Sequence, residues 1–485
     1  MSPTRGGAQE DQAGEADSVD REAISGAAEG GKGTWRHTAF HVATTIATPA
    51  AYAPLPFALA SLGWPLGVCS LVIGTLVTWC SSLVVASLWQ WNGEKHTSYR
   101  LLAKSIFGGN ISPMIPLCID QVIINIPEVY ERFTLSDDKK LHFVEGPWGY
   151  WYVSFFQQVA SIGNNVAIQI AAGSSLKAVY RHYYAADDGA AVTLQHFILL
   201  FGAFEMFLSQ LPDIHSLRWV NATCTASTIG FAVTAISVTL YDGHRIDRKE
   251  VGYSLQGTTA TKIFRGFNAL GTIAFSFGDA MLPEIQSTIR EPVRRNMYKG
   301  VSTAYLLIVM SYWTLAFSGY WSFGSEVQPY ILSSLTAPAW AIVMANLFAV
   351  IQITGCFQIY CRPTYAYFEE RIQAKNMRRK AWVWRLMYTS VYMAAITLVA
   401  TAMPFFGDFV SVCGAVGFTP LDFVLPALAF LKAGKLPKNP GLRHAAKALG
   451  STVAVLFSVV GALACIGAIR AIVLDIKTYK FFHDM

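Results

Sequence analysis

Carboxyl-bearing residues lie inside or beside long apolar stretches of this sequence, and three of them, Glu205, Asp279 and Glu284, could take part in proton chemistry. A carboxylate is costly to place in hydrocarbon, so an intramembrane Asp or Glu indicates either a function or a protonated, hydrogen-bonded group. Asp279 follows Gly278 and precedes Pro283, where the helix is expected to break and to meet water. Asp279 is therefore the first candidate for proton coupling and Glu205 the second, whereas Glu284 also suits a helix cap.

Small residues surround two expected helix breaks, the first marked by Pro49, Pro54 and Pro56 and the second by Gly278 and Pro283. A helix that restarts after a break presents unpaired backbone N–H groups and the positive end of its dipole, which suit a carboxylate. Small residues let a ligand approach the backbone, although they also serve simple packing of membrane helices. The predicted substrate-binding residues are Thr45, Ala47, Thr48 and Ala50 at the first break, Ser276, Gly278 and Asp279 at the second, and Asn165 and Gln352 in two further spans. Interhelical hydrogen bonding explains the last two equally well.

Other kinds of chemistry find no support in the sequence. It contains no GxxxxGK[ST], HExxH or GxSxG motif, so an ATP-driven pump or a hydrolase lacks its machinery. The eight cysteines are scattered without metal-type spacing and indicate buried reduced thiols. We therefore expect no enzyme activity and no cofactor. A channel stays possible, but paired broken helices favour a carrier.

Elements long enough to cross a bilayer must position these residues. The chain has 485 residues, of which 53% are hydrophobic and 14% are charged, against roughly 25% charged in ordinary soluble domains. Apolar runs of about 20 residues span the hydrocarbon of a bilayer as helices. About eleven such spans are expected, near residues 36–60, 63–91, 149–178, 196–211, 216–241, 263–286, 298–323, 335–369, 383–403, 405–431 and 449–474.

The polar segments predict how the chain is oriented. Residues 1–33 are polar, acidic and rich in Gly and Ala, and are expected to form a disordered cytoplasmic tail ahead of one transmembrane domain, 34–485. Most Lys and Arg clusters fall in loops that an internal N-terminus would place in the cytoplasm, which favours that orientation and an external C-terminus. The net charge of +6 therefore indicates membrane anchoring, and nucleic acid is not an expected partner.

The two breaks resemble each other. Residues 53–56 (APLP) parallel residues 280–283 (AMLP), and this register superposes Ile46 on Ile273. Four ordinary spans separate the two broken ones, as in transporters built from inverted repeats whose broken helices form the binding site at the midplane. The pattern predicts an all-α polytopic membrane protein with a LeuT-like five-plus-five inverted repeat and an eleventh, peripheral helix.

Several longer motifs resemble the plant amino acid/auxin permease family, in particular its GABA transporter-like branch. They are WRHTAFH (35–41), PLPFA (54–58), LGW (62–64), SQLPDIHSLR (209–218), PEIQSTI (283–289), TLAFSGYWSF (314–323), MPFFGD (403–408) and GFTPLDFVLP (417–426). The resemblance covers most of the chain from about residue 34. It implies eleven LeuT-like helices and proton-driven uptake of GABA, related ω-amino acids or other amino acids across the plasma membrane. The expected partners are therefore the lipid bilayer and a small amino acid.

The chain departs from that family in two places. Residues 108–146 resemble an insertion before the third span, and Glu205 stands where relatives are expected to have an apolar residue. An insertion that disturbs the third span would put transport in doubt, so a transport-inactive sensor or interaction protein is one alternative. A carrier of auxin-like aromatic acids in the same fold is the other.

Overall fold

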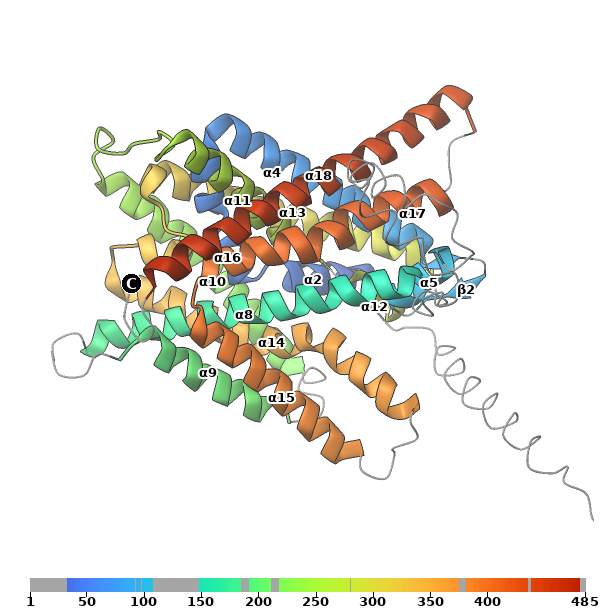
Figure 1. Ribbon diagram of the computed structural model, residues 1–485, viewed down its shortest axis with the longest axis horizontal. Helices are drawn as coiled ribbons and strands as arrows, with labels where there is room; N and C mark the ends of the chain where they lie inside the picture. The colour runs from blue at the N-terminus through green and yellow to red at the C-terminus, as the bar shows by residue number, and fades with distance from the viewer. Residues whose placement is uncertain are drawn as a thin grey trace, which may run out of the picture.

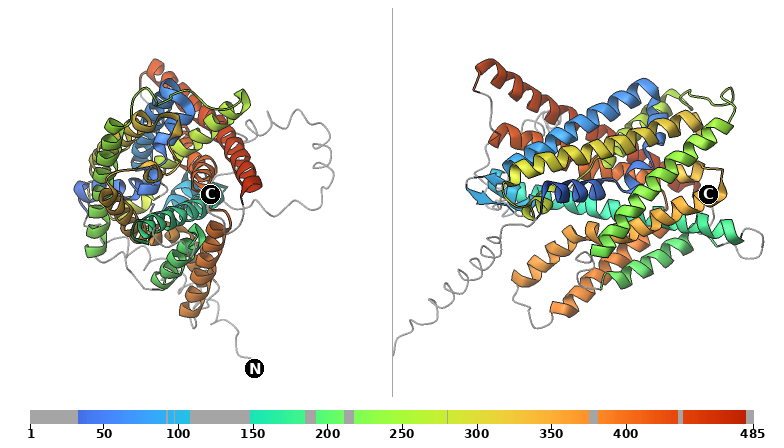
Figure 2. Two further views of the ribbon diagram at one scale, coloured as in Figure 1. Left: turned by 90° about the vertical axis from the view of Figure 1, so that its left-hand side faces the viewer. Right: turned by 180° about the vertical axis from the view of Figure 1, so that it is seen from behind.

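The chain folds into a bundle of long helices whose axes run roughly along one direction (Figure 1). The computed structural model describes residues 33–91, 93–96, 98–107, 148–184, 192–210, 218–279, 281–374, 381–434 and 438–479. The predicted tail, apart from Gly33, and the predicted insertion at 108–146 lie outside these residues. Strands β1 (Gln90–Trp91) and β2 (Glu94–Lys95) pair as a short antiparallel hairpin at one end of the bundle (Figure 2).

The helices take up nearly all of the described residues. In chain order they are α2 (Trp35–Ile46), α3 (Pro49–Tyr52), α4 (Leu55–Leu88), α5 (Tyr99–Phe107), α8 (Trp148–Tyr184), α9 (Leu194–Leu208), α10 (Arg218–Arg245), α11 (Thr259–Ser276), α12 (Leu282–Ser287), α13 (Val293–Phe323), the 3₁₀ turns η2 (Gly324–Glu326) and η3 (Ile331–Ser334), α14 (Ala339–Ala374), α15 (Ala381–Ala402), α16 (Phe406–Val412), the π-helix η5 (Cys413–Val424), α17 (Leu425–Ala433) and α18 (Pro440–Thr478).

Each predicted span coincides with one or more of these helices, so the all-α polytopic fold is confirmed. The first two spans meet inside α4, where Gly63 adopts a left-handed φ of 74° that favours glycine. A side chain at Gly67 would touch Leu59, so the chain turns back at Gly63 into the second span.

Among the described residues, seven helical segments are long and apolar enough to cross a membrane by length and composition alone. They are Pro49–Leu88, Thr223–Arg245, Val293–Glu326, Ala339–Glu369, Trp382–Ala402, Phe406–Ala433 and Pro440–Lys477. The remaining predicted spans miss this threshold for local reasons: α9 has 15 residues, the broken segments are short, and α8 carries several buried amides. Those amides lie inside the bundle, where neighbouring helices rather than lipid surround them.

The two broken segments lie within the bundle, and α18 lies at its edge. α2 packs against α13, whereas α11 packs against α4, α18 and η5. α18 contacts α11 and η5 on one side and exposes Leu449, Leu456 and Ile466 on the other. An apolar face without protein contacts suits lipid, so α18 has the position predicted for an eleventh, peripheral helix. At another edge, α9 and α15 lie side by side (Figure 2).

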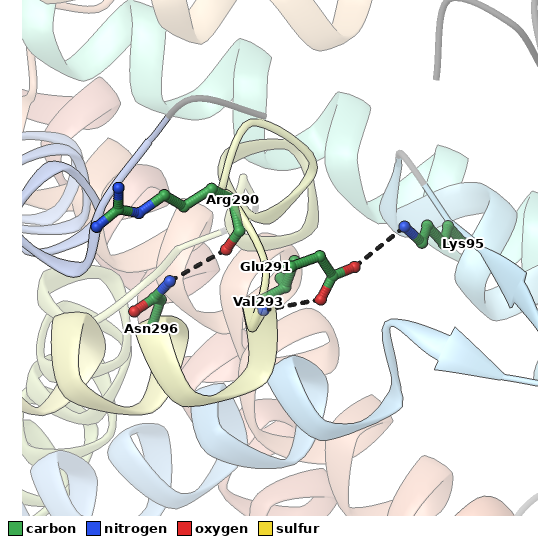
Figure 3. Close-up of polar contacts among 5 residues, drawn as sticks. All are labelled: Lys95, Arg290, Glu291, Val293 and Asn296. Atoms are coloured by element: carbon green, nitrogen blue, oxygen red, sulfur yellow. Dashed lines mark hydrogen bonds and ion pairs between the residues drawn. The ribbon is translucent and has the colours of Figure 1, made fainter. Parts of the chain in front are cut away.

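The bundle has two distinct ends. At the N-terminal end, where α2 begins, the Gly33 amide donates to the Thr288 carbonyl at 3.1 Å, and the Arg290 amide donates to the Gly33 carbonyl at 2.9 Å. Lys95 Nζ lies 3.1 Å from Glu291 Oε1 at the same end (Figure 3). At the C-terminal end, where α18 ends, Gln195 donates to the Tyr479 hydroxyl. Helices α2 and α18 thus start and finish at opposite ends, as an odd number of crossings requires.

Candidate substrate site at the two helix breaks

The first break follows from Pro49. Proline has no N–H, so Pro49 cannot donate the helical hydrogen bond to the Thr45 carbonyl four residues earlier. Two tyrosines of neighbouring helices satisfy the exposed carbonyls instead. Tyr360 Oη (α14) lies 2.5 Å from Thr45 O, and Tyr312 Oη (α13) lies 2.7 Å from Ile46 O. The free carbonyl end of α2 is therefore closed by uncharged donors.

The second break lies between α11 and α12, and carboxyl groups satisfy its backbone. The Asp279 amide donates to Asp422 Oδ2 of η5 at 3.0 Å, and the Met281 amide donates to Asp279 Oδ1 at 3.1 Å. Asp279 is 7% exposed, and its Oδ2 has no hydrogen-bond partner among the described residues. Pro283 removes the donor that would otherwise reach the Asp279 carbonyl. The amides that we expected to be open to a ligand here are thus already paired with the chain's own carboxyls.

The break segments contact each other and enclose a small cavity. Ser276 Oγ donates to the Ala51 carbonyl at 2.5 Å and so joins α11 to α3. Beside this contact is a cavity of about 30 Å³, here called the break cavity. Its lining comes from both breaks and from α8, α14 and η5: Thr45, Gly278, Asp279, Met281, Gln157, Ala160, Ser161, Asn164, Tyr360, Pro363 and Phe418. This volume holds about one water molecule, so a substrate would fit only after its lining moves.

Phe418 and Gly278 limit the size of the break cavity. A side chain at Gly278 would collide with the Phe418 ring, so only glycine allows this ring to lie over the break. The same ring packs edge to face against the Phe275 ring, with 5.6 Å between the two ring centroids. Movement of Phe418 away from Gly278 is thus one way to enlarge the cavity.

The predicted site residues fall into three groups. Thr45, Gly278 and Asp279 line the break cavity. Ala47, Thr48, Ala50 and Ser276 are buried at the breaks without lining it. Asn165 and Gln352 are buried elsewhere: Asn165 donates to the Tyr392 hydroxyl of α15 at 2.9 Å, and Gln352 donates to Cys356 Sγ on its own helix at 3.0 Å. Their bonds match the packing interpretation of these two residues.

Glu205, the second candidate for proton coupling, lies away from both breaks. It is fully buried on α9, where Gln358 Nε2 of α14 donates to its Oε2 at 3.0 Å. The same Gln358 nitrogen also lies 3.2 Å from the Glu205 carbonyl. This pair joins α9 to α14, and Glu205 does not line the break cavity.

Tyr360, Gln157 and Phe418 line the break cavity but were not among the predicted site residues. A signal for Tyr360 exists in the sequence, because Gln352, Cys356 and Tyr360 recur every four residues along one face of α14. Phe418 belongs to the GFTPLDFVLP motif, but a phenylalanine in an apolar helix gives no local sign of a cavity. Its role depends on the packing of η5 against α11.

A helical bundle with two broken helices that meet at a polar cavity is the arrangement of the LeuT-like membrane fold. The structure is similar to the crystal structure of MhsT in complex with L-phenylalanine, with a TM-score of 0.54 and 12% identity, and the match covers 92% of this chain and 99% of that chain. At this level of identity the similarity shows the fold.

Sequence comparison defines the family. The profile of the transmembrane amino acid transporter proteins matches residues 31–473. GABA transporter 1 from Arabidopsis thaliana is 32% identical over 94% of this chain and 94% of its own length. Lysine histidine transporter-like 1 from the same plant is 27% identical over 92% of this chain and 90% of its own length. The chain therefore belongs to the transmembrane amino acid transporter family, and it is a transporter rather than an enzyme.

Proposed function

We propose that this protein is a proton-coupled symporter that imports 4-aminobutyrate (GABA) and related amino acids across the plasma membrane, with its N-terminus in the cytoplasm. Family membership and the similarity to a relative named GABA transporter 1 support the substrate class. The observation that carries the coupling is Asp279, a buried carboxyl on the break cavity whose Oδ2 has no partner among the described residues.

The first break offers both kinds of group that an amino acid needs. The Thr45 and Ile46 carbonyls can accept from a substrate ammonium once the tyrosine hydroxyls that cover them move away. The Ala50 amide, at the start of α3, has no acceptor among the described residues and suits a substrate carboxylate. Tyr360 lines the break cavity and therefore covers the carbonyl nearest to a bound substrate.

The second break supplies the proton site in this mechanism. Protonation of Asp279 removes a negative charge from the break cavity, and the free Oδ2 can take that proton without breaking the bond from the Met281 amide to Oδ1. Asp422 lies on the other side of the Asp279 amide, so a proton at either carboxyl changes the field at the other. An inward proton gradient would then favour the protonated, substrate-loaded protein.

The primary test is uptake of radiolabelled 4-aminobutyrate by cells that express the chain, at acidic and at near-neutral external pH. We expect saturable uptake that increases at acidic pH, collapses with a protonophore and is inhibited by related amino acids. Uptake of an auxin-like aromatic acid in its place would assign the second substrate class. No uptake of any amino acid, with the protein present at the cell surface, would favour the transport-inactive alternative.

Asp279→Asn tests the coupling residue. The amide keeps the shape of the side chain and an oxygen that can accept from Met281, but it cannot take the proton. We expect acid-stimulated uptake to fall by roughly tenfold or more, since interactions with a charged group are worth about 1.5–3 kcal/mol. Glu326→Gln, at an exposed acid outside the break cavity, is the matched control. Proton-dependent uptake that is unchanged in Asp279→Asn would remove this residue from the mechanism.

A further inference from the structure

A cavity of about 450 Å³ lies at the C-terminal end of the bundle, between α11, α16 and α18 and the segment around η3. It is separate from the break cavity, with which it shares no lining residue. We call it the end cavity. Its charged lining residues are Arg265, Asp408, Arg470 and Asp475, so it contains groups of both signs.

One wall of the end cavity presents hydrogen-bond acceptors. The Asn268 side chain and the Asp475 carboxyl both lie close to the carboxyl of Asp408. Asp408 is 6% exposed and Asn268 is 9% exposed, yet Asp408 Oδ2 and Asn268 Oδ1 have no partner among the described residues. Buried acceptors are normally paired, and an ammonium group has three N–H donors, enough to pair with both of these oxygens.

Arg470 provides the complementary group. Its guanidinium lies 4.4 Å from the centroid of the Phe264 ring, which holds the guanidinium on one face. A guanidinium that stacks on a ring keeps its N–H groups in the plane for other partners, and a carboxylate matches that geometry with two parallel hydrogen bonds. Arg265 lines the same cavity from α11 and adds positive charge.

The spacing of these groups selects the kind of ligand. Arg470 and Asp475 are five residues apart on α18, which separates them by about 7.5 Å along the helix axis. Asp408 lies beside Asp475. A ligand that meets both ends needs an ammonium and a carboxylate several bonds apart, as in an ω-amino acid. An α-amino acid carries the two charges on one carbon and is too short.

We propose that the end cavity is a second binding site for a small zwitterion of the ω-amino acid type. The ammonium is bound by Asp408 and Asn268, and the carboxylate is bound by Arg470. This inference rests on the proposed transport of amino acids. It adds a second site formed by α11, α16 and α18, and neither α16 nor α18 contributes a residue to the break cavity.

The test is the number of 4-aminobutyrate molecules bound by the purified full-length protein in lipid nanodiscs, measured with the radiolabelled compound. We expect about two molecules per chain for the wild type and about one for Asp408→Asn or Arg470→Gln. The half-saturating concentration for uptake should also rise roughly tenfold in both variants. Alanine, which is too short to reach both walls, should compete weakly for the second site.

Exposed charged residues outside the end cavity provide matched controls. Glu326→Gln and Lys477→Gln remove the same charges at exposed positions that do not line the end cavity and should behave as wild type. Wild-type uptake with one bound molecule per chain, unchanged in Asp408→Asn and Arg470→Gln, would overturn the second site and leave the proposed function intact. A wild type that neither binds nor takes up 4-aminobutyrate would overturn both.

Discussion

The two helix breaks solve the same structural problem with different chemistry. In each, a proline removes one helical hydrogen bond and leaves backbone groups exposed in a setting that does not tolerate them. At the first break, hydroxyls of Tyr312 and Tyr360 pair with carbonyls. At the second, carboxyls of Asp279 and Asp422 pair with amides. The first break can therefore keep its shape at any physiological pH, whereas the second depends on how many protons its carboxyls hold.

The largest effect is expected where η5 packs against the second break. In Gly278→Val, the new side chain would collide with the Phe418 ring at the second break. Overpacking of this kind costs about 1–3 kcal/mol and would fill the small break cavity. We expect uptake to be lost even where the protein reaches the surface. Gly252→Val is the control, because a side chain there meets nothing within 4 Å. Normal uptake by Gly278→Val would show that the second break is not on the substrate path.

The next effect separates charge from hydrogen bonding at the second break. Asp422→Asn keeps an acceptor for the Asp279 amide, whereas Asp422→Leu leaves that buried amide unpaired at a cost of about 1–3 kcal/mol. We expect Asp422→Asn to retain uptake with an altered pH dependence, and Asp422→Leu to lose both uptake and thermal stability. The measurements are pH-dependent uptake and thermal unfolding in detergent. Equal behaviour of the two variants would mean that the hydrogen bond from the Asp279 amide contributes nothing, and a wild-type pH dependence in Asp422→Asn would mean that the charge of Asp422 contributes nothing.

A smaller effect is expected at the first break. Tyr360→Phe removes the donor to the Thr45 carbonyl, and Tyr312→Phe removes one of two donors to the Ile46 carbonyl, which also accepts from the Thr48 amide at 2.8 Å. Tyr360→Phe should lose about 1–3 kcal/mol of stability, less if water replaces the hydroxyl, and Tyr312→Phe should lose less than Tyr360→Phe. The pH dependence of uptake should stay that of the wild type, because no titrating carboxyl changes. A shifted pH profile in either variant would contradict the division between a neutral and a titrating break.

The positions of the two helix breaks could be predicted from the sequence, but the groups that pair with their exposed backbone could not. Proline positions are local, so the sequence located both interruptions and placed Thr45, Gly278 and Asp279 on the cavity. The matched Leu55-Pro56 and Leu282-Pro283 do each begin a helix, α4 and α12. The alignment of residues 53–56 with residues 280–283 does not show that α2 already ends at Ile46. That end depends on Pro49 and on the tyrosines that pair with the freed carbonyls.

The partners of the exposed groups could not be predicted in the same way. Asp422 meets Asp279 across 143 residues of sequence, and Tyr360 meets Thr45 across 315. Such pairs are set by how the π-helix η5 and α14 pack against the breaks. Asn165 and Gln352 show the converse, because an amide in an apolar helix is visible in the sequence but its direction is not. Both of them bond to side chains away from the cavity.

The smallest effect concerns a titrating contact outside the breaks, at the N-terminal end. The hydrogen bond from Lys95, followed by that from the Val293 amide, lowers the pKa of Glu291 below its ordinary value (Figure 3). A carboxyl with a lowered pKa adds stability above its unfolded pKa, and this stability is lost as the pH falls through the folded pKa. The side chains of Lys95 and Glu291 are 44% and 65% exposed, so the pair contributes about 0.5 kcal/mol or less.

Thermal unfolding of Glu291→Gln measures this contribution and compares it with the carboxyls of the second break. We expect a slightly less stable variant at neutral pH, and no difference from the wild type once the medium is acidic enough to protonate Glu291. High salt should remove the difference as well, because it screens exposed pairs. Glu326→Gln, at an exposed acid that forms no ion pair with the described residues, should show no such dependence. A difference that persists in acid would mean that Glu291 acts through its shape rather than its charge, and would leave the second break as the pH-sensitive part of the described structure.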